Sequence, residues 1–321
     1  MRSFKMLLTV GPDNHTGFRK HLEELSHLVD KGEFIPVKEK YSKKTIQRII
    51  QKKPSLTIIG GRNWIKRNHK ILSRIPGKKG VLYTSPLAQA EISNEEIKNL
   101  QIYFQWLDSK KIDYLFFSSK SLASLFNRKD VFYLPAPSTK EIKYSREIKK
   151  IPKQNIVGLI NDKAVHKNIL NTIAGISLSR KTEKFIVNGL PAEYFDLLKR
   201  FGLKRITKDA GFLEDREYKN TLKSIKLLLY LSFSESFCYS VFEAMILGTP
   251  VLVSRAIDWV ETKELIINNP RDHKEIAKKL DYILSLNKKE YLILSERCKK
   301  NALKIMGKNN LISTKVIESL L

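Results

Sequence analysis

The chain has 321 residues, 42% of them hydrophobic, which is enough for two domains with cores of ordinary size. No run of about 18 apolar residues occurs, so we expect no transmembrane helix. The short apolar run near the first residue is too brief for a signal peptide. Cys238 and Cys298 are far apart in the sequence and show no metal-ligand spacing. We therefore expect a cytoplasmic protein with no disulfide framework.

The chain is strongly basic, with 59 Lys or Arg residues against 33 Asp or Glu residues and a formal net charge of +26. This surplus favours anionic partners such as nucleotide phosphates, anionic lipid headgroups or nucleic acid. An AT-rich genome would give the same excess of lysine, and the two explanations stay open. The lysines are spread along the chain without interleaved aromatic residues, so we expect no stacking platform for single-stranded nucleic acid.

In the first half of the chain, short apolar runs alternate with segments of helical periodicity, the pattern of a parallel α/β sheet. We predict strands at residues 4–10, 33–37, 56–59, 80–84, 114–118 and 132–135, and helices at 18–29, 43–52 and 95–107. The polar, charged segment 140–153 follows and is typical of an interdomain linker.

The second half repeats the alternation and predicts a second α/β domain. We predict strands at residues 155–160, 184–187, 227–231 and 251–253, and a further strand beginning at 206. Helices are predicted at 165–176, 217–224, 239–247, 272–286, 288–305 and about 311–321, with 197–200 inside another helix. The last helix is expected to return to the first domain.

Residues 230–254 form the most informative stretch, which predicts a strand, a loop, a helix, a turn and a second strand. Gly248 would end the helix as a C-cap residue. Glu235 lies in the loop, at the carboxyl end of a parallel strand, where open α/β sheets bind ligands. Glu243 lies eight residues later on the helix. The free N–H groups at the start of that helix suit a phosphate, and a neighbouring carboxylate suits sugar hydroxyls.

Glu235 and Glu243, followed by Ala244-Met245 and by Gly248 to Val251 (GTPV), resemble a known family. The pattern is similar to that of the GT-B glycosyltransferases that use nucleotide sugars with retention, the family 4-like group with a Glu-x7-Glu motif. The resemblance implies that Glu235 contacts hydroxyls of the donor sugar and is the catalytic candidate. It also implies that Glu243 holds the ribose of the nucleotide.

The resemblance assigns further residues by their places in the motifs. The donor diphosphate would meet Lys167 and the backbone of the loop and helix start, and the full set of donor candidates is Lys167, Glu243, Ser236, Phe237, Cys238, Tyr239, Gly158, Gly189 and Phe212. Candidates for contacts with the acceptor, or for the lining of the cleft, are Asn14, His15, Thr16, Gly17, Ser85 and Gln89.

The chain also departs from the family pattern. Leu159 stands where relatives have an Arg, and no His follows the predicted strand 80–84. Ser236 and Cys238 replace two glycines of the usual Gly-Phe-Gly. A single cation, Lys167, would bind diphosphate as a point charge and less rigidly than an Arg fork.

The expected fold is therefore GT-B, with two Rossmann-like α/β domains facing across a cleft. We expect an acceptor-binding domain at residues 1–145, a nucleotide-sugar domain at 146–310, and a terminal helix at 311–321. The expected activity is metal-independent transfer of a hexose from a nucleotide diphosphate sugar, such as a UDP- or GDP-hexose, to an acceptor hydroxyl, with no cofactor. A lipid-linked or cell-surface glycan and a peripheral contact with the inner face of the membrane fit the charge.

A second hypothesis stays open. The missing Arg, the missing His and the charge of +26 also fit a catalytically inactive GT-B-like protein that binds nucleic acid or another polyanion. For the enzyme hypothesis, by contrast, we do not expect nucleic acid to be a partner.

Overall fold

The structure is a computed structural model, which describes residues 5–13, 17–37, 43–60, 69–86, 88–89, 93–139, 155–160, 164–188, 190–211 and 213–321. It divides into two compact units, each described here by itself. Unit 1 comprises Met1–Lys140 and Met306–Leu321, and unit 2 comprises Glu141–Ile305.

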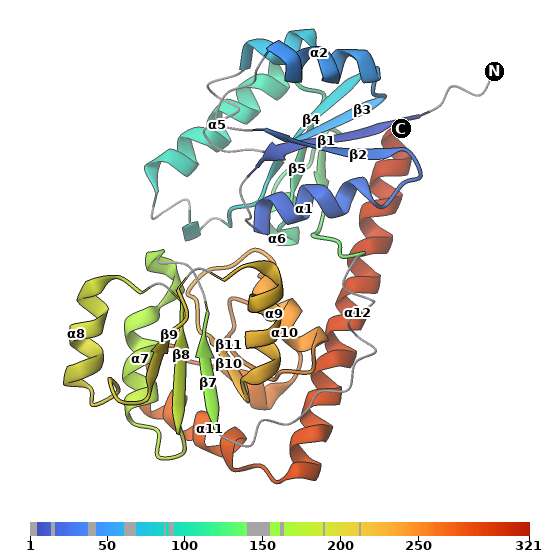
Figure 1. Cartoon of the computed structure of the whole chain (residues 1–321). Coiled ribbons are helices and arrows are strands. Elements are labelled where there is room, and N and C mark those ends of the chain that lie inside the picture. The colour runs from blue at the N-terminus through green and yellow to red at the C-terminus, as the bar shows by residue number, and fades with distance from the viewer. Residues whose placement is uncertain are drawn as a thin grey trace. The chain divides into compact units, whose positions relative to one another are not determined.

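Unit 1 is an α/β unit built on a six-stranded sheet (Figure 1). All strand pairs are parallel, in the order β2-β1-β3-β4-β5-β6. The strands are β1 Leu7–Pro12, β2 Gly32–Val37, β3 Leu56–Gly60, β4 Lys78–Tyr83, β5 Tyr114–Phe117 and β6 Val131–Tyr133. The helices are α1 Gly17–Ser26, α2 Lys43–Lys52, α5 Asn94–Asp108, the short α6 Lys120–Ala123 and the 3-10 helix His69–Arg74.

The sheet of unit 1 buries both of its faces, because alternate strand residues point to opposite sides. On one face, Leu8 and Val10 of β1 belong to a core with residues of α2 and α5, among them Ile49 and Leu107. On the other face, Leu7 belongs to a core with residues of α1 and of the end of the last helix. The strands are mostly apolar because both faces of the sheet are covered.

Helix α1 carries a histidine in this second layer. His21 is buried, and its Nε2 has no hydrogen-bond partner among the described residues. Burial lowers the pKa of His21 from 6.5 to about 3, against the opposing effect of a hydrogen bond to the backbone of Pro135. The imidazole is therefore neutral in the folded protein at neutral pH.

Acid is expected to destabilise unit 1 through this residue. Between about pH 6.5 and pH 3 the unfolded chain binds a proton at His21 that the folded chain does not, so stability falls as the pH falls. The loss is about 1.4 kcal/mol for each pH unit. Urea unfolding of the wild type and of His21→Gln across this range checks it, since the variant should show the flatter profile. Parallel profiles would contradict the assignment.

Unit 2 has a second six-stranded parallel sheet, in the order β12-β11-β10-β7-β8-β9. The strands are β7 Ile156–Leu159, β8 Lys184–Val187, β9 Thr207–Asp209, β10 Leu227–Tyr230, β11 Val251–Ser254 and β12 Ile266–Ile267. The helices are α7 Ile169–Ser177, α8 Ala192–Arg200, α9 Asp215–Ser224, α10 Tyr239–Ile246, α11 His273–Ser285 and α12 Lys288–Leu320, with 3-10 turns at Val165–Lys167 and Lys263–Leu265.

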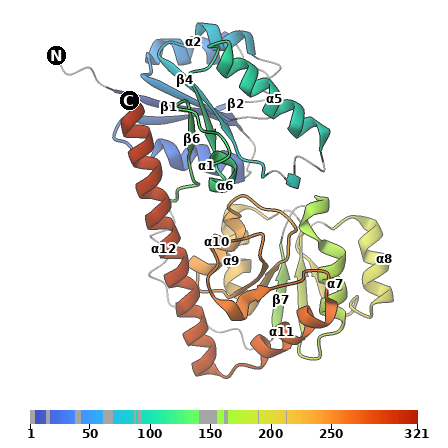
Figure 2. The ribbon, with the colours of Figure 1, turned by 180° about the vertical axis from the view of Figure 1, so that it is seen from behind.

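Helices cover both faces of this sheet. The two opposite views agree that α9 and α10 lie on one side of the strands and α7 and α8 on the other (Figures 1 and 2). The chain runs from β7 outwards to β8 and β9, then returns to the other side of β7 and continues through β10. The strand order therefore reverses between β7 and β10, and the loops after these two strands diverge at that point. Open α/β sheets bind ligands at such a switch point.

The long helix α12 differs from the prediction of two helices. Residues 306–310 include Gly307 and two asparagines, which are typical of helix ends. In the structure Asn309 donates to the Ala136 carbonyl and Asn310 pairs with the backbone of Ser138, so their amides bond to another segment of unit 1. The helix continues without a break from Lys288 to Leu320, and its residues from Met306 onward belong to unit 1.

The α/β class with two Rossmann-like units is confirmed. Each predicted strand overlaps an observed one, and only the two-residue β12 was not predicted. The helix predicted from residue 165 begins as α7 at Ile169, because Asn168 adopts a left-handed conformation, with φ 55°, that interrupts the first turn. None of the described helices is both long and apolar enough to cross a membrane.

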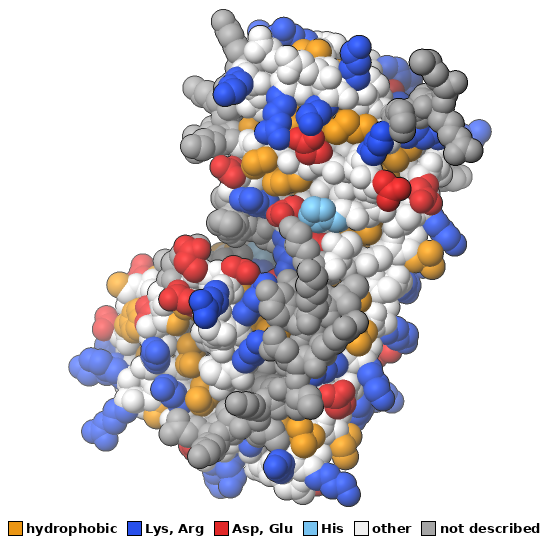
Figure 3. Space-filling view, turned by 45° about the vertical axis from the view of Figure 1, so that its right-hand side comes forward, with side chains coloured by type: hydrophobic (Ala, Val, Ile, Leu, Met, Phe, Trp, Pro, Cys, Tyr) orange, Lys and Arg blue, Asp and Glu red, His pale blue; other side chains and the backbone are white. Residues whose placement is uncertain are grey.

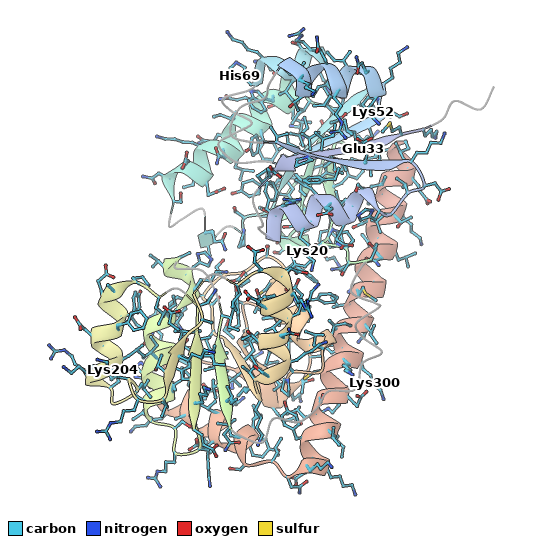
Figure 4. All side chains as sticks on the ribbon, viewed as in Figure 1. Lys20, Glu33, Lys52, His69, Lys204 and Lys300 are labelled. Carbon is cyan, nitrogen blue, oxygen red and sulfur yellow. The ribbon has the colours of Figure 1, made fainter. Side chains whose placement is uncertain are left out.

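The basic side chains come from many elements and form no single stripe on the face drawn in Figure 3. Lys20 on α1, Lys204 after α8 and Lys300 on α12 illustrate this spread (Figure 4). Some of the positive charge is paired, as where Lys52 lies 2.7 Å from the Glu33 carboxylate. The described lysines and arginines thus lie on many separate parts of the surface.

Candidate active site

The strongest candidate site lies in unit 2, where the loops after β7 and β10 meet. Lys167 ends the 3-10 turn that follows β7, and Glu235 lies in the loop that follows β10. β7 and β10 are neighbouring parallel strands, so their carboxyl ends lie at the same edge of the sheet. The two residues are 68 positions apart in the sequence and come together through this strand order.

Lys167 and Glu235 form a buried ion pair. The Nζ–Oε1 distance is 2.6 Å, and each side chain is only 7% exposed. The ammonium also donates to the hydroxyl of Tyr230, the last residue of β10, at 2.8 Å. A buried charge is tolerated when it is paired and hydrogen-bonded, as here, and removal of one partner leaves the other charge uncompensated.

Further hydrogen bonds join the turn after β7 to the loops after β10 and β12. Asn168 uses its side-chain amide to donate to the carbonyls of Leu231 and Pro270, at 3.1 and 2.8 Å. The backbone N–H of Phe233 donates to the His166 carbonyl at 2.7 Å. Lys167 therefore stands on a turn that is fixed on both sides. The left-handed conformation of Asn168 is the local feature that lets the chain turn there.

Helix α10 begins at Tyr239, shortly after Glu235. Phe237 packs against Trp259 and Phe242, with ring centroids 5.5 and 5.6 Å apart, and its carbonyl accepts a hydrogen bond from the Trp259 indole at 2.6 Å. This aromatic contact fixes the segment from Ser236 to Tyr239. The first backbone N–H groups of α10 thus lie next to the ion pair and give a fixed site suited to an anion.

Cys238 occupies the N-cap position of α10 with φ 63°, a conformation that favours glycine. The family resemblance implies a glycine at this place, and glycine adopts such a conformation without strain. Burial raises the pKa of the Cys238 thiol, and the nearby Glu235 carboxylate adds to the rise. The thiol is therefore neutral at physiological pH and acts as a small packed side chain.

The positive φ of residue 238 can be tested by substitution. Cys238→Gly is expected to be more stable than Cys238→Ala by about 1 kcal/mol, since only glycine adopts positive φ without strain. In ordinary helical or extended positions the order is reversed. Chemical unfolding of the two variants measures the difference, and a more stable Ala variant would contradict the observed conformation.

Glu243 lies on the second turn of α10 and is buried, with 7% exposure. The hydroxyl of Tyr218 on α9 is out of contact with solvent and approaches the Glu243 carboxylate and Ser240 without the geometry of a hydrogen bond. Burial raises the pKa of Tyr218, and the negative charge of Glu243 raises it further. A buried carboxylate beside a buried hydroxyl can accept hydrogen bonds from a ligand that carries neighbouring hydroxyl groups.

Gly158 lies inside β7, in close contact with the side chain of Ile225. A Cβ built there would lie 2.7 Å from Cδ1 of Ile225. Leu159, where the family resemblance implies an Arg, ends the same strand and is buried in the core. Leu159 thus supplies no cation at this edge, and the Lys167 ammonium comes from the turn that follows β7.

Three of the candidates for acceptor or cleft contacts, Gly17, Ser85 and Gln89, are described and belong to unit 1. Gly17 begins α1 in unit 1, Ser85 is buried just after β4, and Gln89 is half-buried four residues later. The other candidates, Asn14, His15, Thr16, Gly189 and Phe212, lie outside the described residues. The described residues contain no group of three or more His, Cys, Asp or Glu side chains arranged to hold a metal ion.

Four residues that support the site were missed by the sequence analysis: Tyr230, Asn168, Trp259 and Tyr218. Each acts through a contact with a residue far along the chain or with another helix, and no spacing in the sequence marks such contacts. Tyr230 had one available signal, because it is a polar-tipped aromatic at the carboxyl end of a buried strand.

Comparison with known structures supports the fold. The chain is similar to Anabaena Alr3699/HepE in complex with UDP and glucose, with 13% identity, a TM-score of 0.75 and coverage of 98% of this chain and 99% of that one. It is also similar to sucrose-phosphate synthase from Thermosynechococcus elongatus, with 12% identity, a TM-score of 0.70 and coverage of 98% and 99%. At these identities the likeness shows the fold, which is GT-B.

A third similar structure is a point mutant of S. aureus TarM in complex with fondaparinux, alpha-GlcNAc-glycerol and UDP. The identity is 15% and the TM-score 0.65, and the match covers 86% of this chain but 57% of TarM, so this chain spans little more than half the length of that protein. A comparison with curated protein sequences finds no significant match.

The family model described as "Glycosyl transferases group 1" matches residues 141–305. The matched segment contains β7 to β12, the Lys167–Glu235 ion pair and Glu243. It covers just over half of the chain and all of unit 2. The chain therefore belongs to the group 1 glycosyltransferases.

Proposed function

We propose that this glycosyltransferase moves a hexose from a nucleotide diphosphate sugar to an acceptor hydroxyl, with retention at the anomeric carbon. The observation that carries the proposal is the buried pair of Lys167 and Glu235, 2.6 Å apart, at the switch point of the sheet and beside the start of α10. In this arrangement one anion-binding helix terminus, one cation and one carboxylate converge, as transfer from a sugar diphosphate requires.

Each group has a distinct role in the proposed reaction. The N–H groups of Ser236 to Tyr239 and the Lys167 ammonium bind the diphosphate and stabilise the charge that grows on it as it departs. Glu235 accepts hydrogen bonds from hydroxyls of the hexose, and Glu243 accepts them from the ribose. The bond between the anomeric carbon and the diphosphate oxygen breaks, and a bond to the acceptor oxygen forms on the same face of the sugar. The proton of the acceptor hydroxyl passes to the departing diphosphate. The protein groups carry the charge of the diphosphate, and no metal ion is required.

The similar structures support a nucleotide-sugar donor. HepE was crystallised with UDP and glucose, and in another structure with UDP-glucose. TarM was crystallised with UDP and with a glycoside of GlcNAc. These ligands are those of the relatives, and they make UDP-hexoses the first donors to test here.

For the acceptor, we propose a lipid-linked or cell-surface glycan reached from the inner face of the membrane. The net charge of +26 supports it, because a basic protein is attracted to anionic headgroups without inserting a helix. Co-sedimentation with vesicles of phosphatidylcholine and phosphatidylglycerol at low and at high salt tests it. Salt-sensitive binding is expected, and absence of binding at low salt would contradict it.

The test of the donor site is thermal unfolding with UDP, GDP, ADP and their hexose conjugates. A ligand at about 100 times its dissociation constant raises the free energy of unfolding by about 2.7 kcal/mol, which shifts the midpoint visibly. A shift with one nucleotide sugar supports the proposal and identifies the donor. No shift with any nucleotide, together with a salt-sensitive shift with DNA or RNA, would overturn it in favour of a polyanion-binding protein.

A further inference from the structure

A third loop reaches the edge of the sheet that carries Lys167 and Glu235. The residues that follow β12 lead through Pro270 and Arg271 to α11, and the Pro270 carbonyl accepts the side-chain hydrogen bond of Asn168 at 2.8 Å. Arg271 directly follows Pro270, and Asn168 directly follows Lys167, so this hydrogen bond brings the two cations' segments together. The sequence analysis did not single this arginine out.

The guanidinium of Arg271 is held against the loop that carries Glu235. Its central carbon lies 5.4 Å from the centroid of the Phe233 ring, which is 40% exposed. Phe233 in turn donates its backbone N–H to the His166 carbonyl, beside Lys167. An aromatic face attracts and orients an arginine and leaves the edge of its guanidinium free to donate hydrogen bonds.

Arg271 also has no carboxylate partner among the described residues. The adjacent acid, Asp272, is turned to α11, where its side chain accepts hydrogen bonds from the backbone N–H groups of Lys274 and Glu275. The positive charge of Lys167, by contrast, is balanced by Glu235 at 2.6 Å. A diphosphate that enters this edge would thus meet one pair with no net charge and one arginine that has no carboxylate partner among the described residues.

We propose that Arg271 is the second cation for the donor diphosphate. Its guanidinium makes the paired hydrogen bonds to phosphate that Leu159 cannot make. The inference rests on the proposed function. A guanidinium binds two phosphate oxygens in parallel, and it keeps its charge at any physiological pH. The diphosphate is then bound between the start of α10, Lys167 and an arginine that belongs to the loop after β12.

The experiment is calorimetric titration of UDP, GDP and ADP into the full chain, with Arg271→Gln and Arg271→Lys as variants. The matched control is Arg205→Gln, an exposed arginine just before β9, at the amino edge of the same sheet. For the nucleotide that binds wild type, Arg271→Gln is expected to weaken the affinity by about 10 to 100-fold and to lessen its dependence on salt. Arg271→Lys should be intermediate, and Arg205→Gln unchanged.

Two further ligands test whether Arg271 binds the diphosphate or another part of the donor. Binding of the parent nucleoside should be the same in Arg271→Gln and wild type, because the nucleoside has no phosphate. If Arg271→Gln weakens only a uronic acid conjugate such as UDP-glucuronate and leaves UDP unchanged, Arg271 binds a sugar carboxylate and the inference is overturned. Unchanged affinity for every nucleotide in Arg271→Gln overturns it while the donor site stands. A wild type that binds no nucleoside diphosphate overturns the proposed function as well.

Discussion

Glu235→Ala is expected to lower sugar transfer by at least about 100-fold and to lower the free energy of unfolding by about 3 kcal/mol. The two effects have different causes. Activity falls because the group proposed to hold the hexose is lost. Stability falls because Lys167, with a side chain only 7% exposed, loses its partner. Donor turnover and urea unfolding of the same preparation measure both effects.

A double variant separates the two causes. Glu235→Ala combined with Lys167→Met removes both charges and should recover most of the lost stability, since two paired buried charges contribute little net stability. It should recover no activity. The matched control is Glu261→Ala, which breaks the exposed pair with Lys304 at 2.8 Å and should cost less than about 1 kcal/mol. Transfer at the wild-type rate in Glu235→Ala would contradict the proposal that Glu235 is the catalytic residue.

Glu243→Gln is expected to weaken the binding of ribonucleoside diphosphates by about 10 to 100-fold and to leave the affinity for inorganic pyrophosphate unchanged. The buried carboxylate is proposed to accept hydrogen bonds from the ribose, and an amide accepts them less strongly. Calorimetric titration with UDP, 2′-deoxy-UDP and pyrophosphate gives the measurement. The preference of the wild type for the ribose over the deoxyribose form should shrink in the variant.

Glu217→Gln provides the control for this prediction. It removes the same charge from α9, one residue before Tyr218, where the side chain is exposed. Its affinity for UDP should match that of wild type. Equal weakening of UDP and pyrophosphate by Glu243→Gln would instead point to a general loss of structure at α10, and the ribose assignment would fail.

Much of the secondary structure of unit 2 was predictable, because the residues that indicate each strand and helix lie close together in the sequence. A run of apolar residues from Leu227 marks a buried strand, Gly248 marks the end of α10, and Val251 begins the next strand at once. The spacing of Glu235 and Glu243, eight positions apart, predicted a ligand site on this unit. Such features depend on the preferences of single residues and on neighbours within one or two turns.

The sequence by itself therefore determined the alternation of strands and helices and the α/β class, and it pointed to the loop that carries Glu235 as the candidate ligand site. Only the tertiary structure decided which groups face one another there. The contact between Lys167 and Glu235 depends on β10 lying next to β7, and the orientation of Arg271 depends on the loop after β12 reaching the turn at Asn168. The unbroken course of α12 depends on Asn309 bonding to the backbone of Ala136. Contacts between residues 68 and 173 positions apart follow from strand order and packing, which no local pattern encodes.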